Sequence, residues 1–278
     1  MDLSLPAWVY SNSEFFALEK EVIFGQAPQL VCHENDIPLP GDYETFTFLE
    51  RDTFVVRAQD GSIRSFYNVC RHRAHRLLTK EKGNCGNRIV CPYHAWSYNT
   101  VGDLINVPYF EDYEGLSMAD YGLVEIEHEI YQGFIFVRFE SGGRSVSDWL
   151  SPILGELQHY RLPEVEAIAE RSCYEVRANW KNGADNYIDA LHVRVAHPGL
   201  NGLLNKSYGI TQASDDVYRL EGEVKEIVGN SDLAKKYHAC LPNVPHLPES
   251  HQKSWLYFLL WPNLMFNLYP DQVEFMQF

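Results

Sequence analysis

The chain has 278 residues, of which 45% are hydrophobic and 14% aromatic, so it can bury sizeable cores and is long enough for two domains. Its formal net charge of −15 argues against a nucleic-acid partner, because such proteins need clustered Lys and Arg to displace counterions. The longest strongly apolar run, residues 255–261, is too short for a membrane span, and the N-terminus lacks the basic and apolar stretches of a secretory signal. We therefore expect a cytoplasmic protein that binds neither nucleic acid nor membrane.

The first part of the chain is expected to hold one helix and then a β-domain. Ser11-Asn12-Ser13-Glu14 resembles a helix-capping box, and apolar residues at helical spacing follow it as far as Phe24. From about residue 40 the apolar residues alternate with a period of two, which predicts strands at 45–49, 53–58, 63–69, 88–90, 122–128 and 134–139. Residues 1–39 are thus assigned to an N-terminal helix and lead-in, and residues 40–140 to a small β-domain.

A polar, glycine-bearing segment at 141–145 is typical of a connection between domains, so a second domain is placed at 146–278. Its patterns predict helices at 146–160 and 180–192, and strands at 173–178, 217–224, 254–261 and 264–269. The expected fold class is α+β, with a β-domain followed by a domain that mixes helices with a sheet.

Two short Cys and His pairs form the first metal-binding pattern. Cys70-Arg71-His72 is followed, after eighteen residues, by Cys91-Pro92-Tyr93-His94, and each pair comes directly after a strand-like run. A Rieske centre needs two thiolates on one iron and two imidazoles on the other, so each pair supplies one ligand of each kind. The alternative is a zinc knuckle, although zinc fingers usually pair Cys with Cys and His with His. The remaining cysteines lack such spacing and are interpreted as buried or free thiols: Cys32, Cys85, Cys173 and Cys240.

A second pattern lies in the second domain. Asp189 and His192 are three residues apart on an expected helix and would share a face, and His197 follows where Pro198-Gly199 indicates that the helix ends. Two histidines and a carboxylate on one face are typical of mononuclear iron(II) that activates O2. Taken alone, two histidines at this spacing would be interpreted as packed or surface residues.

The two patterns together resemble a known family. Cys91-Pro-Tyr-His94-Ala-Trp96-Ser-Tyr98, followed by Gly102 and Leu104, is similar to the second cluster loop of Rieske oxygenases and Rieske ferredoxins. Asn179-Trp180-Lys181 and the segment from Asp185 to Pro198 resemble the catalytic domain of the Rieske non-haem iron oxygenases, the aromatic ring-hydroxylating dioxygenase family. The resemblance covers nearly the whole chain from about Tyr10. One departure is Ala95, where the family commonly has Gly, because Ala is strained at a positive φ.

The resemblance implies a fold and a set of site residues. A Rieske [2Fe-2S] β-sandwich domain would precede a helix-grip catalytic domain that is C-terminally truncated. The cluster ligands would be Cys70, His72, Cys91 and His94. His192 and His197 would bind a mononuclear Fe(II), and Asp189 would bridge an iron-ligand histidine of its own subunit and a cluster histidine of the next. Asn186 would lie near the iron, with a helix-capping or surface role as the alternative.

The resemblance also implies partners and leaves one ligand unassigned. The subunits would form a head-to-tail homotrimer, with or without a small beta subunit, and electrons from NAD(P)H would arrive through a separate reductase, directly or by way of a ferredoxin. The third iron ligand in the family is a carboxylate well beyond the segment 261–267. No carboxylate here matches it, since Asp271 and Glu274 are too close to that segment. We therefore expect a truncated chain, or a variant whose iron triad is incomplete.

The function implied is that of a terminal oxygenase subunit of a Rieske oxygenase, a mono- or dioxygenase that uses O2 to hydroxylate a small organic substrate, by ring hydroxylation or by O- or N-demethylation. Asp189 favours an aromatic substrate over a quaternary amine, for which related enzymes tend to have Glu at the bridging position. The alternative from another class is an electron-transfer protein that uses only the cluster. A zinc-binding interaction module is a third reading. The residues 189–197 favour the oxygenase, because a Rieske ferredoxin needs no such set.

Overall fold

The computed structural model describes residues 5–168, 171–205, 209–225 and 232–278, and the chain packs as two compact units. The unit that we call the β unit comprises Gly25–Val146 and Pro163–Glu170. The other, which we call the α/β unit, comprises Met1–Phe24, Ser147–Leu162 and Arg171–Phe278. The N-terminal segment therefore belongs with the second half of the chain rather than with the β-strands that follow it.

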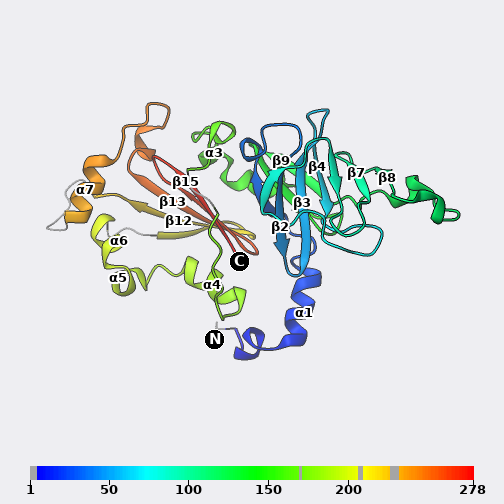
Figure 1. Ribbon diagram of the computed structural model, residues 1–278. Helices are drawn as coiled ribbons and strands as arrows, with labels where there is room; N and C mark the ends of the chain where they lie inside the picture. The colour runs from blue at the N-terminus through cyan, green and yellow to red at the C-terminus, as the bar shows by residue number, and fades with distance from the viewer. Residues whose placement is uncertain (1–4, 169–170, 206–208, 226–231) are drawn as a thin grey trace. The chain divides into compact units, whose positions relative to one another are not determined.

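The β unit contains antiparallel sheets of short strands (Figure 1). One sheet has the order β1-β10-β9, from Gln29–His33, Phe134–Arg138 and Glu127–Tyr131. A second has the order β4-β3-β2-β5, from Ile63–Tyr67, Arg51–Arg57, Asp42–Phe48 and Lys82–Asn84. A third has the order β6-β7-β8, from Arg88–Val90, Ser97–Asn99 and Leu104–Asn106. The hairpin between β6 and β7 carries the second Cys and His pair at its turn.

The core of the β unit reaches directly under the two predicted cluster loops. Phe54 and Val56 of β3 and Phe66 of β4 are fully buried, and Phe54 and Val56 point to the same face of their sheet because they are two residues apart. They share one apolar cluster with Cys70, Cys91, Trp96 and Tyr98. Both loops are therefore anchored on a packed core.

The α/β unit is built on one antiparallel meander (Figure 1). Its sheet has the order β11-β12-β13-β14-β15, from Gly209–Ser214, Val217–Glu223, Ser254–Leu260, Leu264–Leu268 and Val273–Gln277. Its helices are α1 (Ser13–Val22), α3 (Leu154–Leu157), α4 (Trp180–Ile188), α5 (Val193–Ala196), α6 (Pro198–Leu203) and α7 (Asp232–Cys240). Helix α2 (Val146–Leu150) starts at the last residue of the segment Gly25–Val146 and otherwise belongs to the α/β unit. None of the helices in the described part of the chain is long and apolar enough to cross a membrane.

Helix α4 packs on one face of this sheet. Ala184 contacts Leu259 of β13 and Met265 of β14 in a buried cluster. Gly183 faces the ring of Phe278, and a Cβ at this position would overlap that ring unless the Phe278 side chain moved. The polar side chain of Tyr187 reaches the same face, where its hydroxyl donates a hydrogen bond to Asn267 of β14.

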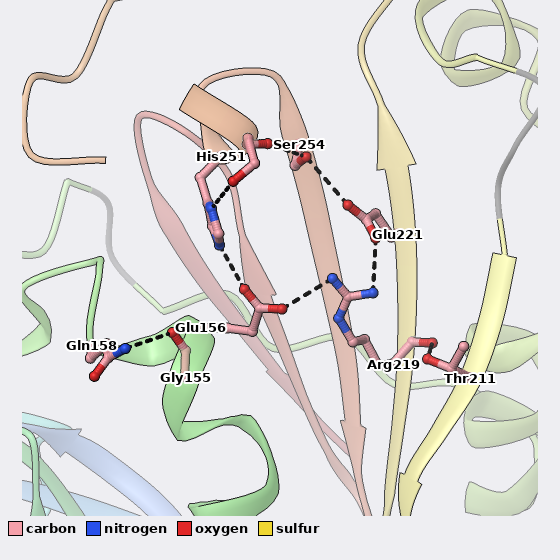
Figure 2. A network of polar contacts seen from close by, with 9 residues as sticks. Gly155, Glu156, Gln158, Thr211, Arg219, Glu221, His251 and Ser254 are labelled. Carbon is pink, nitrogen blue, oxygen red and sulfur yellow. Dashed lines mark hydrogen bonds and ion pairs between the residues drawn. The ribbon is translucent and has the colours of Figure 1, made fainter. Parts of the chain in front are cut away.

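Helix α3 is joined to the sheet by a polar network (Figure 2). The carboxylate of Glu156 accepts from Arg219 Nη2 at 3.1 Å and lies 2.6 Å from His251 Nε2. Arg219 Nη1 also binds Glu221 at 2.9 Å, and Ser254 contacts the other oxygen of that carboxylate. All of these charges have an opposite or hydrogen-bonded neighbour, which offsets their partial burial.

The predicted N-terminal helix and most strands are confirmed to within a few residues. Helix α1 starts at Ser13, and the side chain of its N-cap residue Asn12 accepts a hydrogen bond from Phe15 N at 2.7 Å. The strand expected at 88–90 matches β6, and those at 217–224, 254–261 and 264–269 match β12, β13 and β14. The periodicity of apolar side chains was sufficient to predict these strands because each strand has at least one buried face.

Four predicted elements are wrong in whole or in part. The helix at 146–160 is broken into α2, a 3-10 turn at Ser151–Ile153 and α3, because Pro152 removes a backbone donor. Residues 173–178 form no strand, and the strand expected at 122–128 begins only at Glu127. The helix at 180–192 ends at Ile188, where Asp189 has extended backbone angles.

Candidate metal centres

The two loops that carry the Cys and His pairs have the same backbone hydrogen-bond pattern. In the first, Ala74 N donates to Cys70 O at 3.0 Å, and Cys70 N donates to His75 O at 2.8 Å. In the second, Ala95 N donates to Cys91 O at 3.0 Å, and Cys91 N donates to Trp96 O at 2.8 Å. Ala74 and Ala95 close the turns with φ of 55° and 58°. Ala95 therefore adopts the left-handed conformation that glycine would adopt without strain.

The loops bring the four predicted cluster residues together as a thiol pair and an imidazole pair. The side chains of Cys70 and Cys91 are each 2% exposed and belong to one buried cluster. The rings of His72 and His94 have centroids 4.7 Å apart. Two thiols on one side and two imidazoles on the other are the ligand arrangement that a Rieske cluster requires.

His72 provides a direct test of whether a metal group fits this site. Its Nδ1 atom is buried and has no hydrogen-bond partner among the residues that the structure describes, although a buried polar atom is normally paired. Trp96 stacks on the ring at a centroid distance of 4.7 Å and an interplanar angle of 5°. Burial, followed by the nearby His94, lowers the pKa of His72 and so favours the neutral imidazole that binds metal. The residues present therefore fit a metal group that accepts Nδ1 as a ligand.

The spread of these ligand atoms distinguishes a cluster from a single ion. Among the described residues, one set of three metal-binding side chains has all its ligand atoms within 4.8 Å of each other, and it is Cys32, Asp36 and Glu44. The four predicted cluster residues do not form such a set. Ligands of one tetrahedral zinc would converge closely, whereas two irons keep the thiol pair and the imidazole pair apart. The geometry thus favours the cluster over the zinc knuckle.

Tyr98 of β7 is a site residue whose role the sequence did not reveal. Its hydroxyl lies 3.4 Å from Cys70 Sγ and accepts a hydrogen bond from Arg71 N at 3.0 Å. Since Arg71 N is the donor in the second bond, the hydroxyl proton remains free to point at the sulfur. Burial raises the pKa of Tyr98, and the hydrogen bond to Cys70 raises it further. Tyr98 was part of the recognised loop motif, but its contact with a residue 28 positions earlier cannot be inferred from local pattern.

The second candidate centre lies where α4 ends. Asp189 is the C-cap of α4, and its carboxylate accepts from Leu191 N at 2.8 Å and lies 3.2 Å from His192 Nδ1. The hydrogen bond from Leu191 is the main cause that lowers the pKa of Asp189, and His192 adds to it. Asp189 and His192 therefore meet through the turn after the helix, rather than on a helix face as the sequence predicted.

The two predicted iron-binding histidines lie near each other. The rings of His192 and His197 have centroids 5.2 Å apart, and α5, which ends at Ala196, joins them. A helix does end just before Pro198, since α5 ends at Ala196, and Pro198 then begins α6, because proline is well suited to a first helical position. His197 is exposed and His192 is partly buried, so both imidazoles are accessible.

Asn186 and the two acidic residues near the end of the chain are placed differently. Asn186 is exposed on α4, and its carbonyl oxygen accepts from Asp189 N at 3.3 Å. Glu274 of β15 accepts from Asn267 at 3.0 Å and from Tyr269 at 3.3 Å. Asp271 is exposed in the turn before that strand.

Two family profiles match the chain. Residues 27–121 match the Rieske [2Fe-2S] domain, and residues 164–278 match the catalytic domain of the ring hydroxylating alpha subunit. The carnitine monooxygenase oxygenase subunit of Escherichia coli K12 is 33% identical over 233 residues, which are 78% of this chain and 62% of that protein. The large oxygenase component of the naphthalene 1,2-dioxygenase system of Pseudomonas putida is 34% identical over 205 residues, 70% of this chain and 44% of that protein.

Solved structures agree with these matches. A crystal structure of the quaternary ammonium Rieske monooxygenase CntA with a bound inhibitor superposes with a TM-score of 0.83 at 28% identity, covering 99% of this chain and 70% of that chain. Naphthalene 1,2-dioxygenase from a Rhodococcus species gives a TM-score of 0.78 at 26% identity, covering 95% and 65%.

The fold and the paired Cys and His loops define a Rieske-type protein with a second, catalytic domain of mixed helix and sheet. The chain belongs to the family of Rieske oxygenase large, or alpha, subunits. It spans 62% of the length of the Escherichia coli relative.

Proposed function

We propose that this chain acts as the terminal oxygenase component of a Rieske oxygenase and hydroxylates a small organic substrate with O2. Cys70, Cys91, His72 and His94 would hold the [2Fe-2S] cluster, and His192 and His197 would hold a mononuclear Fe(II). The observation that carries the proposal is the buried Nδ1 of His72, which has no partner in the described part of the chain and lies beside the His94 imidazole. When bound, the cluster supplies single electrons and the iron supplies O2 activation.

At the second centre, Asp189 orients His192 for metal binding. Because the ionised carboxylate of Asp189 is an acceptor, His192 donates through Nδ1–H and keeps the lone pair of Nε2 for the metal. The side chain of Asp189 remains 46% exposed, so a second carboxylate oxygen is available to a neighbouring molecule. Asp189 would thereby link His192 to a cluster histidine of an adjacent subunit in a head-to-tail trimer. Asn186 would lie near the iron.

Partners and location follow from the same assignment. A separate reductase, with or without a ferredoxin, would deliver electrons from NAD(P)H to the cluster, and a small beta subunit would be an optional further partner. Inter-subunit electron transfer is described for a quaternary ammonium Rieske monooxygenase of known structure. We place the protein in the cytoplasm, where a nicotinamide-dependent reductase has its substrate.

The substrate class is tested with a panel of quaternary ammonium and aromatic compounds rather than with a single compound. The relatives include enzymes named for carnitine and glycine betaine, which are quaternary ammonium compounds, and for naphthalene and biphenyl, which are aromatic. The aromatic preference that Asp189 suggested predicts product from the second group. Product from carnitine or glycine betaine alone would contradict that preference without contradicting oxygenase activity.

His192→Ala is the experiment that tests the function. It should abolish product formation from chemically reduced protein and O2, while the visible and EPR signals of the cluster persist. His246→Ala, an exposed histidine in the same unit, is the matched control and should form product like the original chain. Loss of the cluster signals in His192→Ala would contradict the assignment of His192 to the mononuclear iron rather than to the cluster. A chain that transfers electrons but forms no product from any compound would favour the electron-transfer alternative.

A further inference from the structure

The N-terminal helix is bound to α4 by an ion pair that is almost fully buried. Lys181 Nζ lies 2.6 Å from Glu19 Oε1, and the two side chains are only 7% and 3% exposed. Trp180 Nε1 donates to the other carboxylate oxygen at 3.2 Å. A buried charge is costly unless it is paired and hydrogen-bonded, and the carboxylate of Glu19 meets both conditions here.

Aromatic rings complete the surroundings of the lysine. Its Nζ lies 5.7 Å from the ring centroid of Tyr10, 5.5 Å from that of Phe15 and 5.1 Å from that of Trp180. These distances fall within the range in which an aromatic face attracts a cation. Two of the three rings come from the N-terminal segment, which also provides Glu19. The ammonium group therefore has one well-defined position, between α1 and the first turn of α4.

The same segment holds α4 at a second point. Tyr10 OH donates to Asp185 Oδ2 at 2.7 Å, and this bond raises the pKa of Tyr10. Lys181 and Asp185 are four residues apart and lie on one side of α4, and Asp189 is the C-cap at the end of the same helix. The first two contact the N-terminal segment, and the third contacts His192.

We propose that Glu19 and Lys181 are positioning residues for the mononuclear iron site. The N-terminal segment holds α4 at Lys181 and Asp185, so that Asp189 at the end of the helix keeps His192 in the orientation that binds metal. This inference rests on the proposed function of His192 and His197. The residues 1–26 lie outside both family matches, so nothing in those matches assigns this role.

A purely stabilising role would have a different signature. Replacing a buried ion pair by apolar side chains is often neutral for stability, whereas removing one partner leaves an uncompensated charge. Apolar side chains do not fix a distance and a direction as the ion pair does. The double variant Glu19→Leu, Lys181→Met should therefore recover the thermal stability that Glu19→Gln loses, but it should not recover the iron site.

The first measurement is Fe(II) affinity, followed by the EPR signal of the Fe(II)–nitric oxide adduct. Glu19→Gln and the double variant should both weaken Fe(II) binding by about tenfold or more, as changes around metal-ligating histidines do. The Rieske EPR signal should be unchanged. Glu21→Gln makes the same chemical change at an exposed position of α1 and should match the original chain.

A second measurement needs no iron. Hydrogen exchange of the metal-free chain should accelerate at residues 189–197 in Glu19→Gln and in the double variant, while the central strands β12 to β14 keep their protection. Recovery of both iron affinity and protection in the double variant would overturn the positioning role and leave a structural one. If Glu19→Gln matches the original chain in both measurements, the proposal is wrong. If His192→Ala leaves Fe(II) affinity unchanged, the proposed function itself fails, and the positioning role fails with it.

Discussion

The hydroxyl of Tyr98 should set part of the reduction potential of the cluster. It accepts from Arg71 N and is therefore oriented to donate to Cys70 Sγ, 3.4 Å away. Tyr98→Phe removes this one donor and leaves the ring in the buried core under both loops. The extra electron of the reduced cluster increases the negative charge on the sulfur. A donor consequently stabilises the reduced state more than the oxidised state, and its loss should lower the potential.

The size of the shift follows from the strength of such a bond. A hydrogen bond to a charged group contributes about 1.5–3 kcal/mol in total. If one redox state gains roughly 1 kcal/mol more than the other, the potential falls by about 40 mV, since tenfold in a one-electron equilibrium is about 59 mV or 1.4 kcal/mol. The distance of 3.4 Å is typical for a bond to sulfur, so a shift of this size is expected rather than one near zero.

A redox titration followed by the EPR signal of the reduced cluster measures this shift. Tyr93→Phe is the matched control, because Tyr93 lies in the same loop but is 57% exposed. Its potential should equal that of the original chain. An unchanged or raised potential in Tyr98→Phe would refute the assignment of the hydroxyl as donor. Loss of the cluster would show that Tyr98 holds the loops together rather than tuning the sulfur.

Three further outcomes follow from the structure. Ala95→Gly should raise the free energy of unfolding by about 1 kcal/mol in chemical denaturation, because glycine adopts the positive φ at this position without strain. Burial raises the pKa of the Cys85 thiol to about 11, so this thiol stays protonated until the pH rises through about 11. At pH 8 the folded chain should therefore be alkylated much faster at the exposed Cys173 than at Cys85, and equal labelling of the two residues in mass spectrometry would contradict this. Glu156→Gln should lower the free energy of unfolding by about 1–3 kcal/mol, since Arg219 loses a charged partner, and an unchanged midpoint in urea would contradict the role of that network.

The first candidate centre was largely predictable because its information is local. Each loop carries its own Cys, His and turn residues within six positions, and each follows a strand whose buried face is visible as a period of two. The strain expected at Ala95 is present as a positive φ, with the same conformation at Ala74 in the partner loop. What the sequence did not show is the contact of Tyr98 with Cys70, which depends on the pairing of two separate loops.

The structure brings the predicted residues of the second candidate centre near one another, but on a different local structure from the one expected. Spacing placed Asp189 and His192 on a continuous helix, but α4 ends at Ile188 because the carboxylate of Asp189 binds the backbone of Leu191 and draws the chain into a turn. Asp is a poor helix former for this reason, since its short side chain competes for backbone donors. Pro152 likewise interrupts the helix expected at 146–160, because proline has no backbone N–H to donate.

The role of the N-terminal segment was beyond sequence reasoning because its contacts are long-range. Glu19 and Lys181 are 162 positions apart, and each taken alone would be assigned to a solvated helix face. Charged side chains become buried only when the partner is supplied by tertiary structure. A chain lacking residues 1–24 should therefore retain the Rieske EPR signal, which arises in the β unit, and lose Fe(II) affinity in the α/β unit, to which those residues belong. Equal loss at both centres in that truncated chain would show that the segment supports the whole molecule rather than α4.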